Sequence, residues 1–245
     1  MEALKRARER GILISLSTGR TATAASRVIE QLALDGYHMF FDGALVSDPA
    51  THQEIYAQPI SEDIVRQAAD FARRNEVSLE FYSSTHYFAE HETWATEIRR
   101  RLFSIEPQFV DFAEVLKKER IIKGTLTVCS PEERAKADIF SRHFAGNLHF
   151  SVTKSSAYPE VDFINVLAPG VSKRKALEAY ASYLGITLSE VVAIGDGIND
   201  ISLLSSVGLA IAMGNAPDEV KAVAHHITLD VDCNGLAAAI DQYLL

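Results

Sequence analysis

The chain has 245 residues, 47% of them hydrophobic, which is enough for one large domain or two modest ones around a buried core. Its net charge of −9 at pH 7 argues against nucleic acid or an anionic membrane as the main partner, because both repel an acidic surface. The two cysteines, Cys129 and Cys233, lack metal-ligand spacing, and no apolar run approaches the about 20 residues of a membrane span. We therefore expect a cytoplasmic protein without a signal peptide or structural zinc.

Helices and short apolar strands alternate through the first 58 residues. Gly11 suits the end of a first helix, and the pair Asp35-Gly36 suits the end of a second one. The expected elements are helices at 2–10 and about 23–34, and strands at 12–17, 38–41 and 44–46. This alternation predicts βαβ units and a parallel sheet.

A segment of different character follows after about Gln58. Ser61 and Pro131 are typical of helix starts, and the two basic runs at 99–101 and 117–118 are expected to be solvated helix faces. The other expected elements are a hairpin at 77–90 and strands at about 124–129, 148–153 and 161–167. Together they predict a mixed α+β insert at residues 59–167, with aromatic side chains in its core.

The helix–strand alternation returns after residue 168. The expected helices are at 172–184, 200–206, 217–224 and 234–244, and the expected strands are at 191–194, 209–212 and 227–228. We predict an α/β fold in which residues 1–58 and 168–245 form a discontinuous core, a Rossmann-like parallel sheet with helices on both faces.

Three polar segments occur where such folds bind ligands, beyond the carboxyl ends of strands or at a helix start. Residues 18–20 (Thr-Gly-Arg) combine a hydroxyl with a glycine turn whose backbone N–H groups can face an anion. Lys173 supplies a cation at a predicted helix start, and Asp196, Asn199 and Asp200 follow an apolar strand and form a hard-oxygen site suited to Mg²⁺. A hydroxyl, an ammonium and metal-binding carboxylates are the groups that phosphoryl transfer needs.

The order of these segments around a long insert, with Gly-Asp-Gly-x-Asn-Asp at 195–200, resembles the haloacid dehalogenase superfamily of phosphohydrolases. Within it, the chain is similar to the Cof-like group with an α/β (type IIB) cap, over essentially all of its length. The resemblance implies a HAD-type, Mg²⁺-dependent phosphatase and a cap that selects the substrate. It implies catalysis by Lys173, phosphate binding by Thr18, Gly19, Arg20, Lys173 and Asn199, and metal binding by Asp196 and Asp200.

One motif of the resembled family is not found in this chain. The family's nucleophile belongs to an Asp-x-Asp segment on a strand upstream of the Thr-Gly-Arg turn, but no Asp precedes Thr18 here. Two Asp-Gly pairs begin at Asp35 and Asp42, and neither has a second Asp two residues earlier. Asp42 stands where the family usually has Asn-Gly-Ala, so we expect neither pair to replace the nucleophile.

Without the strand that carries the Asp-x-Asp segment, the sequence predicts a gap in the sheet. The family's first strand lies between the strands that end here at Ser17 and Ile194, so without it those two would lie about 9–10 Å apart with unpaired backbone groups. Three explanations are open: the gene starts upstream of Met1, the strands close up, or a strand from another chain fills the slot, for instance by self-association. We favour the first explanation.

Two functions from different classes follow from these observations. The first is a phosphatase of small phosphorylated metabolites, such as sugar phosphates, which acts through an aspartyl-phosphate but is inactive as this chain alone. The second is a non-catalytic relic that binds a phosphate ligand. A nucleotide-binding protein is disfavoured because neither glycine-rich nucleotide motif occurs. Polar insert residues that could contact a substrate are Glu80, Tyr82, His86 and Glu160, although each is expected to be an ordinary strand residue.

Overall fold

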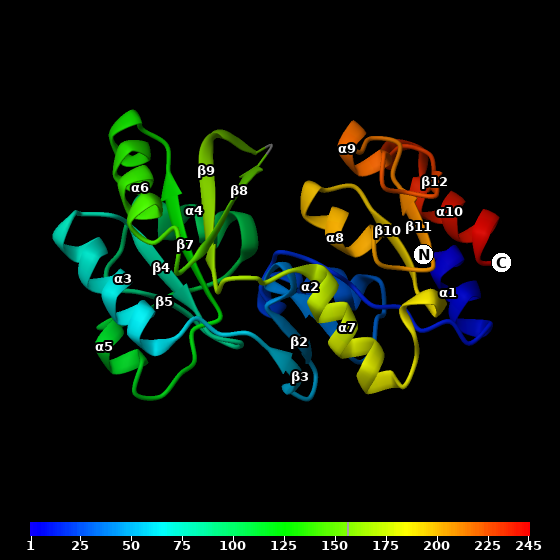
Figure 1. The fold of residues 1–245 in the computed structure, drawn as a ribbon, viewed down its shortest axis with the longest axis horizontal. Coiled ribbons are helices and arrows are strands. Elements are labelled where there is room, and N and C mark those ends of the chain that lie inside the picture. The colour runs from blue at the N-terminus through cyan, green and yellow to red at the C-terminus, as the bar shows by residue number, and fades with distance from the viewer. Residues whose placement is uncertain (156) are drawn as a thin grey trace. The chain divides into compact units, whose positions relative to one another are not determined.

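The computed structural model describes residues 1–155 and 157–245, which form two compact units. The core unit comprises Met1–Gly19, Ser26–Tyr56 and Ser172–Leu245, and the insert unit comprises Arg20–Ala25 and Ala57–Val171. The α/β class expected from the sequence is confirmed (Figure 1). None of the helices in the described ranges has the length and apolar character needed to cross a membrane.

The core unit contains two three-stranded sheets. One has the order β1-β2-β3 with β1 and β2 antiparallel, and the other is parallel with the order β10-β11-β12. The strands are β1 (His38–Phe40), β2 (Leu45–Asp48), β3 (Gln53–Ala57), β10 (Val192–Gly195), β11 (Leu209–Ala212) and β12 (His226–Ile227). The helices are α1 (Glu2–Glu9), α2 (Ala22–Gln31, from Ser26 onward), α7 (Lys173–Leu184), α8 (Ile201–Leu204), α9 (Asp218–Lys221) and α10 (Gly235–Tyr243).

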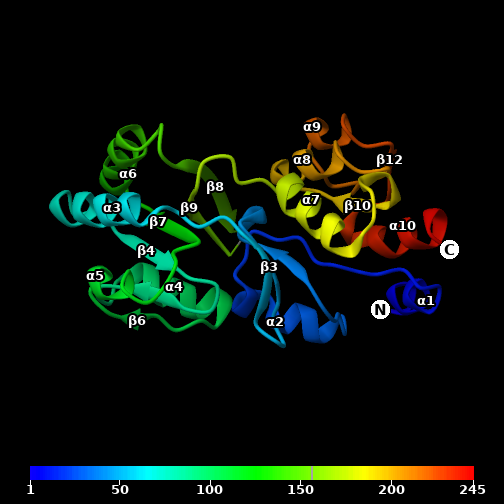
Figure 2. The same cartoon turned by 60° about the horizontal axis from the view of Figure 1, so that its bottom comes forward.

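Apolar side chains cover both faces of β10. Ala193 belongs to a buried cluster with Leu177 of α7 and Leu203 of α8, whereas the next residue, Ile194, packs against a second cluster formed by α1 and α10. Successive side chains of a strand point to opposite faces, so neighbouring residues reach different helix layers. Figures 1 and 2 show α1 and α10 side by side near the two chain ends.

The regular strand expected at residues 12–17 is not formed. The segment is extended and joins β1 through one parallel bridge, between Ser17 and Met39. Before that bridge, the backbone N–H of Leu16 donates to Nδ1 of His38 at 3.3 Å, where a ladder would use a backbone carbonyl. The partner strand β1 has only three residues, so no backbone ladder runs along the whole 12–17 segment, and this explains the difference.

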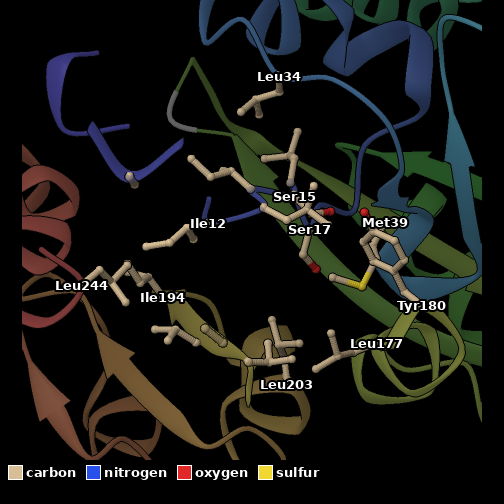
Figure 3. Close-up of a pocket in the computed structure, with 18 of the residues that line it drawn as sticks. Ile12, Ser15, Ser17, Leu34, Met39, Leu177, Tyr180, Ile194, Leu203 and Leu244 are labelled. Atoms are coloured by element: carbon tan, nitrogen blue, oxygen red, sulfur yellow. The ribbon is translucent and has the colours of Figure 1, made fainter. Parts of the chain in front are cut away.

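A cavity of about 620 Å³ lies between this extended segment and β10 (Figure 3). Ile12, Ser15 and Ser17 line one side, and Ile194 and Leu203 line the other. In the described part of the chain, the N–H groups of residues 13–15 donate to no backbone carbonyl, and β10 pairs with β11 alone. One backbone edge of the extended segment and one edge of β10 therefore face the cavity. The sheets β1-β2-β3 and β10-β11-β12 are not joined into one sheet.

The insert unit contains a six-stranded sheet of order β6-β5-β4-β7-β9-β8. The strands are β4 (Leu79–Tyr82), β5 (Tyr87–Ala89), β6 (Gln108–Phe109), β7 (Lys123–Val128), β8 (His149–Ser155) and β9 (Tyr158–Leu167). The helices are α3 (Glu62–Arg74), α4 (Trp94–Phe103), α5 (Phe112–Val115) and α6 (Pro131–His143). Rings from α3, α6 and β8 (Phe71, Phe140 and Phe150) pack edge to face and form the expected aromatic core.

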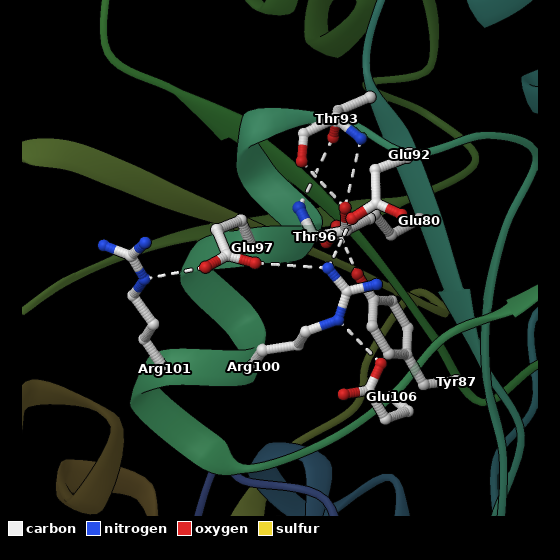
Figure 4. Close-up of polar contacts among 9 residues, drawn as sticks. All are labelled: Glu80, Tyr87, Glu92, Thr93, Thr96, Glu97, Arg100, Arg101 and Glu106. Atoms are coloured by element: carbon white, nitrogen blue, oxygen red, sulfur yellow. Dashed lines mark hydrogen bonds and ion pairs between the residues drawn. The ribbon is translucent and has the colours of Figure 1, made fainter.

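The basic run at 99–101 differs in part from its expected solvated state. Arg100 and Arg101 form exposed ion pairs with acidic residues of α4 and its flanks, as Figure 4 shows. Arg99 is instead buried, donates to Glu80 at 3.2 Å and lies 4.5 Å from the ring centroid of Phe163. The sequence does not reveal this because residues 99 and 100 point to different sides of one helix, and only the sheet beneath α4 decides which side is buried.

Candidate active site

A buried ion pair occupies the centre of the predicted site. The ammonium of Lys173, the first residue of α7, donates to Oδ1 of Asp200 at 2.5 Å and to the carbonyl of Ser17 at 3.3 Å. The side chains of Lys173 and Asp200 are 4% and 11% exposed. The lysine thereby links the end of the 12–17 segment to the loop after β10, and three elements distant in sequence meet at one point.

The second oxygen of Asp200 holds the loop that follows β10. Its Oδ2 accepts hydrogen bonds from the backbone N–H groups of Asp196 (3.1 Å) and Gly197 (2.9 Å). Close approach favours glycine at position 195, because a Cβ there would lie 2.8 Å from the Asp200 side chain. Both carboxylate oxygens of Asp200 therefore have donors within the protein.

Asp196 is oriented by a residue that we did not predict as part of the site. Asn215 donates from Nδ2 to Oδ2 of Asp196 at 3.1 Å, and its Oδ1 accepts the backbone N–H of Val231 at 3.0 Å. Asn215 follows β11 as Asp196 follows the neighbouring β10. The rule that placed Asp196 at the carboxyl end of a strand could have identified Asn215 as well.

Asp42, which sequence reasoning set aside, also lies in the site. Its Oδ1 accepts a hydrogen bond from Nδ2 of Asn199 at 2.7 Å. A Cβ placed on Gly19 would lie 2.7 Å from the same oxygen, so the carboxylate rests against the glycine of the Thr-Gly-Arg loop. A side chain at position 19 would displace the Asp42 carboxylate from this place.

The Thr-Gly-Arg loop is only partly arranged as predicted. The backbone N–H of Thr18 donates to the carbonyl of Met39 at 2.9 Å, so this amide is used within the fold and does not face an anion. Arg20 belongs to the insert unit, where its guanidinium lies 5.8 Å from the ring centroid of Phe103. Phosphate binding by Thr18, Gly19 and Arg20 stays a prediction.

The described residues satisfy part of the requirement for Mg²⁺. Among them, no group of three or more His, Cys, Asp or Glu side chains could hold a metal ion by itself. Mg²⁺ commonly binds through one or two carboxylates together with waters and substrate phosphate oxygens, so this result is compatible with it. Asp196, held by one amide, can offer a carboxylate oxygen, whereas both oxygens of Asp200 already accept hydrogen bonds.

The cavity of the core unit reaches this site. Ser17, Asp196 and Asp200 line the cavity together with the apolar side chains of Figure 3. The buried Ser17 hydroxyl has no hydrogen-bond partner within residues 1–155 and 157–245. A strand placed in the cavity would therefore end among the polar groups of the site.

The polar insert candidates differ in accessibility. Glu80 and Tyr82 are buried, and burial raises the pKa of Tyr82 well above its ordinary value. His86 contacts Glu119 at 3.2 Å, and Glu160 is exposed. Glu80 and Tyr82 thus serve the interior of the insert unit, as expected of strand residues.

Comparison with known proteins gives one consistent family. A family model described as haloacid dehalogenase-like hydrolase matches residues 1–240. The chain is 28% identical over 244 residues to the 5-amino-6-(5-phospho-D-ribitylamino)uracil phosphatase of Bacillus subtilis (strain 168), a match that covers 100% of this chain and 87% of that protein.

Solved structures of the same family share the fold. A haloacid dehalogenase-like hydrolase from Bacteroides thetaiotaomicron matches with a TM-score of 0.83 at 25% identity, covering 98% of this chain and 90% of the other. A subclass IIB sugar phosphatase matches with a TM-score of 0.76 at 25% identity, covering 100% and 90%.

Proposed function

The chain belongs to the haloacid dehalogenase-like hydrolase family, and from this premise we propose that it is a Mg²⁺-dependent phosphatase of small phosphorylated metabolites. The proteins compared above are named phosphatases of a phosphoribitylamino-uracil and of sugars, which supports this class of substrate. The observation that carries the proposal is the buried Lys173–Asp200 pair beside Asp196. A fixed cation next to an oxygen ligand for a metal is the arrangement that offsets charge on a phosphoryl group.

In this proposal each predicted residue has a distinct task. Lys173 neutralises the phosphoryl oxygens, and Asp200 fixes the position of the lysine ammonium and of the loop after β10. The proposed phosphate ligands are Thr18, Gly19, Arg20, Lys173 and Asn199, and the proposed metal residues are Asp196, directly, and Asp200, through water. When bound, Mg²⁺ supplies positive charge that lowers the barrier to attack on phosphorus.

Turnover through an aspartyl-phosphate also needs a nucleophilic carboxylate. We propose that it is supplied by a strand in the cavity, from an attached segment or a partner chain, with Asp-x-Asp at its carboxyl end. A carboxylate oxygen of the first Asp would form a bond to phosphorus as the ester P–O bond breaks, and the second Asp would give its proton to the leaving alcohol. Water would then cleave the acyl phosphate and release inorganic phosphate.

A second candidate, a phosphate-binding protein without turnover, is favoured by one observation. Each of the site's carboxylates already accepts a hydrogen bond from a side chain of the same unit, so none is positioned as an unpaired nucleophile. These pairs are Asp42 with Asn199, Asp196 with Asn215, and Asp200 with Lys173.

Hydrolysis of p-nitrophenyl phosphate in the presence of Mg²⁺ distinguishes the two candidates. We expect the 245-residue chain to be inert and the same chain, preceded by an apolar strand that carries Asp-x-Asp, to hydrolyse the ester. The matched control carries Asn-x-Asn in the added strand and should stay inert, because an amide cannot form the acyl phosphate.

The remaining outcomes are informative as well. If the extended chain folds and binds phosphate without hydrolysing the ester, the protein is a binder. If it neither binds phosphate nor hydrolyses the ester, both candidates are wrong.

A further inference from the structure

The turn that carries Asp42 has an unusual backbone. Phe41, Asp42 and Gly43 follow one another with φ angles of 52°, 57° and 95°. Non-glycine residues seldom adopt positive φ, and bulky residues such as phenylalanine avoid it most strongly. Such conformations persist where the surroundings impose them, and they concentrate at functional sites.

Contacts on both sides hold this turn in place. The backbone N–H of Asp42 donates to the carbonyl of Thr18 at 3.2 Å, and the Phe41 side chain is fully buried. A Cβ on Gly43 would lie 2.4 Å from the carbonyl oxygen of Ser172, directly before Lys173. The turn is therefore locked between the Thr-Gly-Arg loop and the start of α7, and the fold imposes its strained conformation.

The side chain of Asp42 contacts two parts of the proposed phosphate site. Its carboxylate rests against Gly19 and accepts the hydrogen bond from Asn199. An anion held by the Thr-Gly-Arg loop and Asn199 would meet this negative charge at close range. A carboxylate repels an anion, but it accepts a hydrogen bond from a hydroxyl or an ammonium group.

We infer that Asp42 is a specificity-determining residue, which favours phosphate esters that carry a hydroxyl or ammonium donor next to the ester group over esters that lack one. This inference rests on the proposed function, because it assumes that phosphate binds at the Thr-Gly-Arg loop. It adds a selection step inside the core unit, separate from any selection by the insert. Asn199 holds the carboxylate in position for this role.

The test compares the wild-type chain with D42N by isothermal titration calorimetry in the presence of Mg²⁺. The probes are ethyl phosphate, which has no donor next to the ester group, and glycerol 3-phosphate, which has a hydroxyl on the adjacent carbon. Asparagine retains a side-chain oxygen for Asn199 and tolerates positive φ, so the substitution removes the charge and little else. We expect D42N to bind ethyl phosphate about threefold more tightly, from the loss of one unit charge at roughly 6 Å in water-like surroundings, and to lose most of the preference for glycerol 3-phosphate.

The matched control is D35N, which changes the exposed aspartate of the other Asp-Gly pair and should alter neither affinity. D42G, which removes the charge and the acceptor together and adopts positive φ without strain, should reproduce the tighter phosphate binding if D42N misfolds. Binding of both probes with affinities unchanged in D42N would overturn the role of Asp42 and leave the proposed function intact. Failure of the wild-type chain to bind either probe would overturn the role of Asp42, whereas the proposed function is decided by the assay of the extended chain.

Discussion

Lys173 and the residues around it show how single side chains set the electrostatics of the core unit. The lysine and two amides, Asn199 and Asn215, each hold one of three carboxylates. Sequence reasoning identified Lys173, Asp196, Asn199 and Asp200, because strand ends and helix starts mark them locally, although their roles stay proposals. It did not identify Asp42 as a site residue, because the hydrogen-bond partner of Asp42, Asn199, is 157 residues away in the chain.

The first prediction at this scale concerns Asp200. D200N leaves the Lys173 ammonium buried without a counter-charge, and we expect the free energy of unfolding to fall by about 3 kcal/mol. Urea denaturation followed by circular dichroism measures this change. Adding K173M to D200N removes the unpaired charge and should restore part of the loss.

An exposed pair in the same helix serves as the control for D200N. Arg174 and Glu178 of α7 form an ion pair with side chains 57% and 42% exposed, so E178Q should cost no more than about 0.5 kcal/mol. Equal costs for D200N and E178Q would show that the Lys173–Asp200 pair is not a buried charge pair in solution.

Elements whose boundaries depend on local chemistry were predictable. Ser172 caps α7, and Gly185 ends it in the left-handed conformation, close to the expected helix at 172–184. Helix α6 begins at Pro131 with a capping box between Ser130 and Glu133. The strand expected at 12–17 was wrong because strand formation depends on partners, which local sequence does not contain.

Glu133 provides the second prediction, a pH-dependent one. Burial raises the pKa of its carboxyl, but the backbone N–H groups of Cys129 and Ser130 and the indole of Trp94 outweigh burial and lower that pKa to about 2. A carboxyl with a lowered pKa in the folded state stabilises the protein above its unfolded pKa of about 4.3, and this contribution is lost as pH falls toward 2.

The measurement is thermal unfolding of wild type and E133Q between pH 7 and pH 3. E133Q should cost about 1 kcal/mol at pH 7, as for loss of a helix cap, and progressively less below about pH 4.5. E132Q changes the exposed neighbour of Glu133 and should show little effect. A difference between wild type and E133Q that stays constant across this range would contradict the assignment.

At the scale of the whole core unit, the cavity beside β10 is the dominant feature. Both faces of β10 are covered by helices, and yet one edge of β10 and the facing edge of the 12–17 segment have no strand partner across a cavity of about 620 Å³. Unpaired backbone groups inside a sheet are costly, so a strand inserted there would gain hydrogen bonds on both of its edges.

Amide hydrogen exchange tests whether a strand can pair with the backbone edges that face the cavity. We expect the N–H groups of residues 13–15 to exchange rapidly in the 245-residue chain, and those of β11 to exchange slowly, because β11 is paired on both edges. In the chain extended by an apolar strand, residues 13–15 should become protected. Rapid exchange at 13–15 in an extended chain that is otherwise folded would mean that the strand does not enter the cavity.

The sequence by itself determined the α/β class, because periodicity, caps and turn residues are local properties, whereas the insert at 59–167 and the site residues stay predictions. The tertiary structure alone decided that Arg99 is buried, that Asn215 orients Asp196 and that Asp42 rests against Gly19. It also decided that residues 12–17 do not form a regular strand. Each of these depends on groups brought together from distant parts of the chain, where hydrogen-bond partners and burial are set by packing.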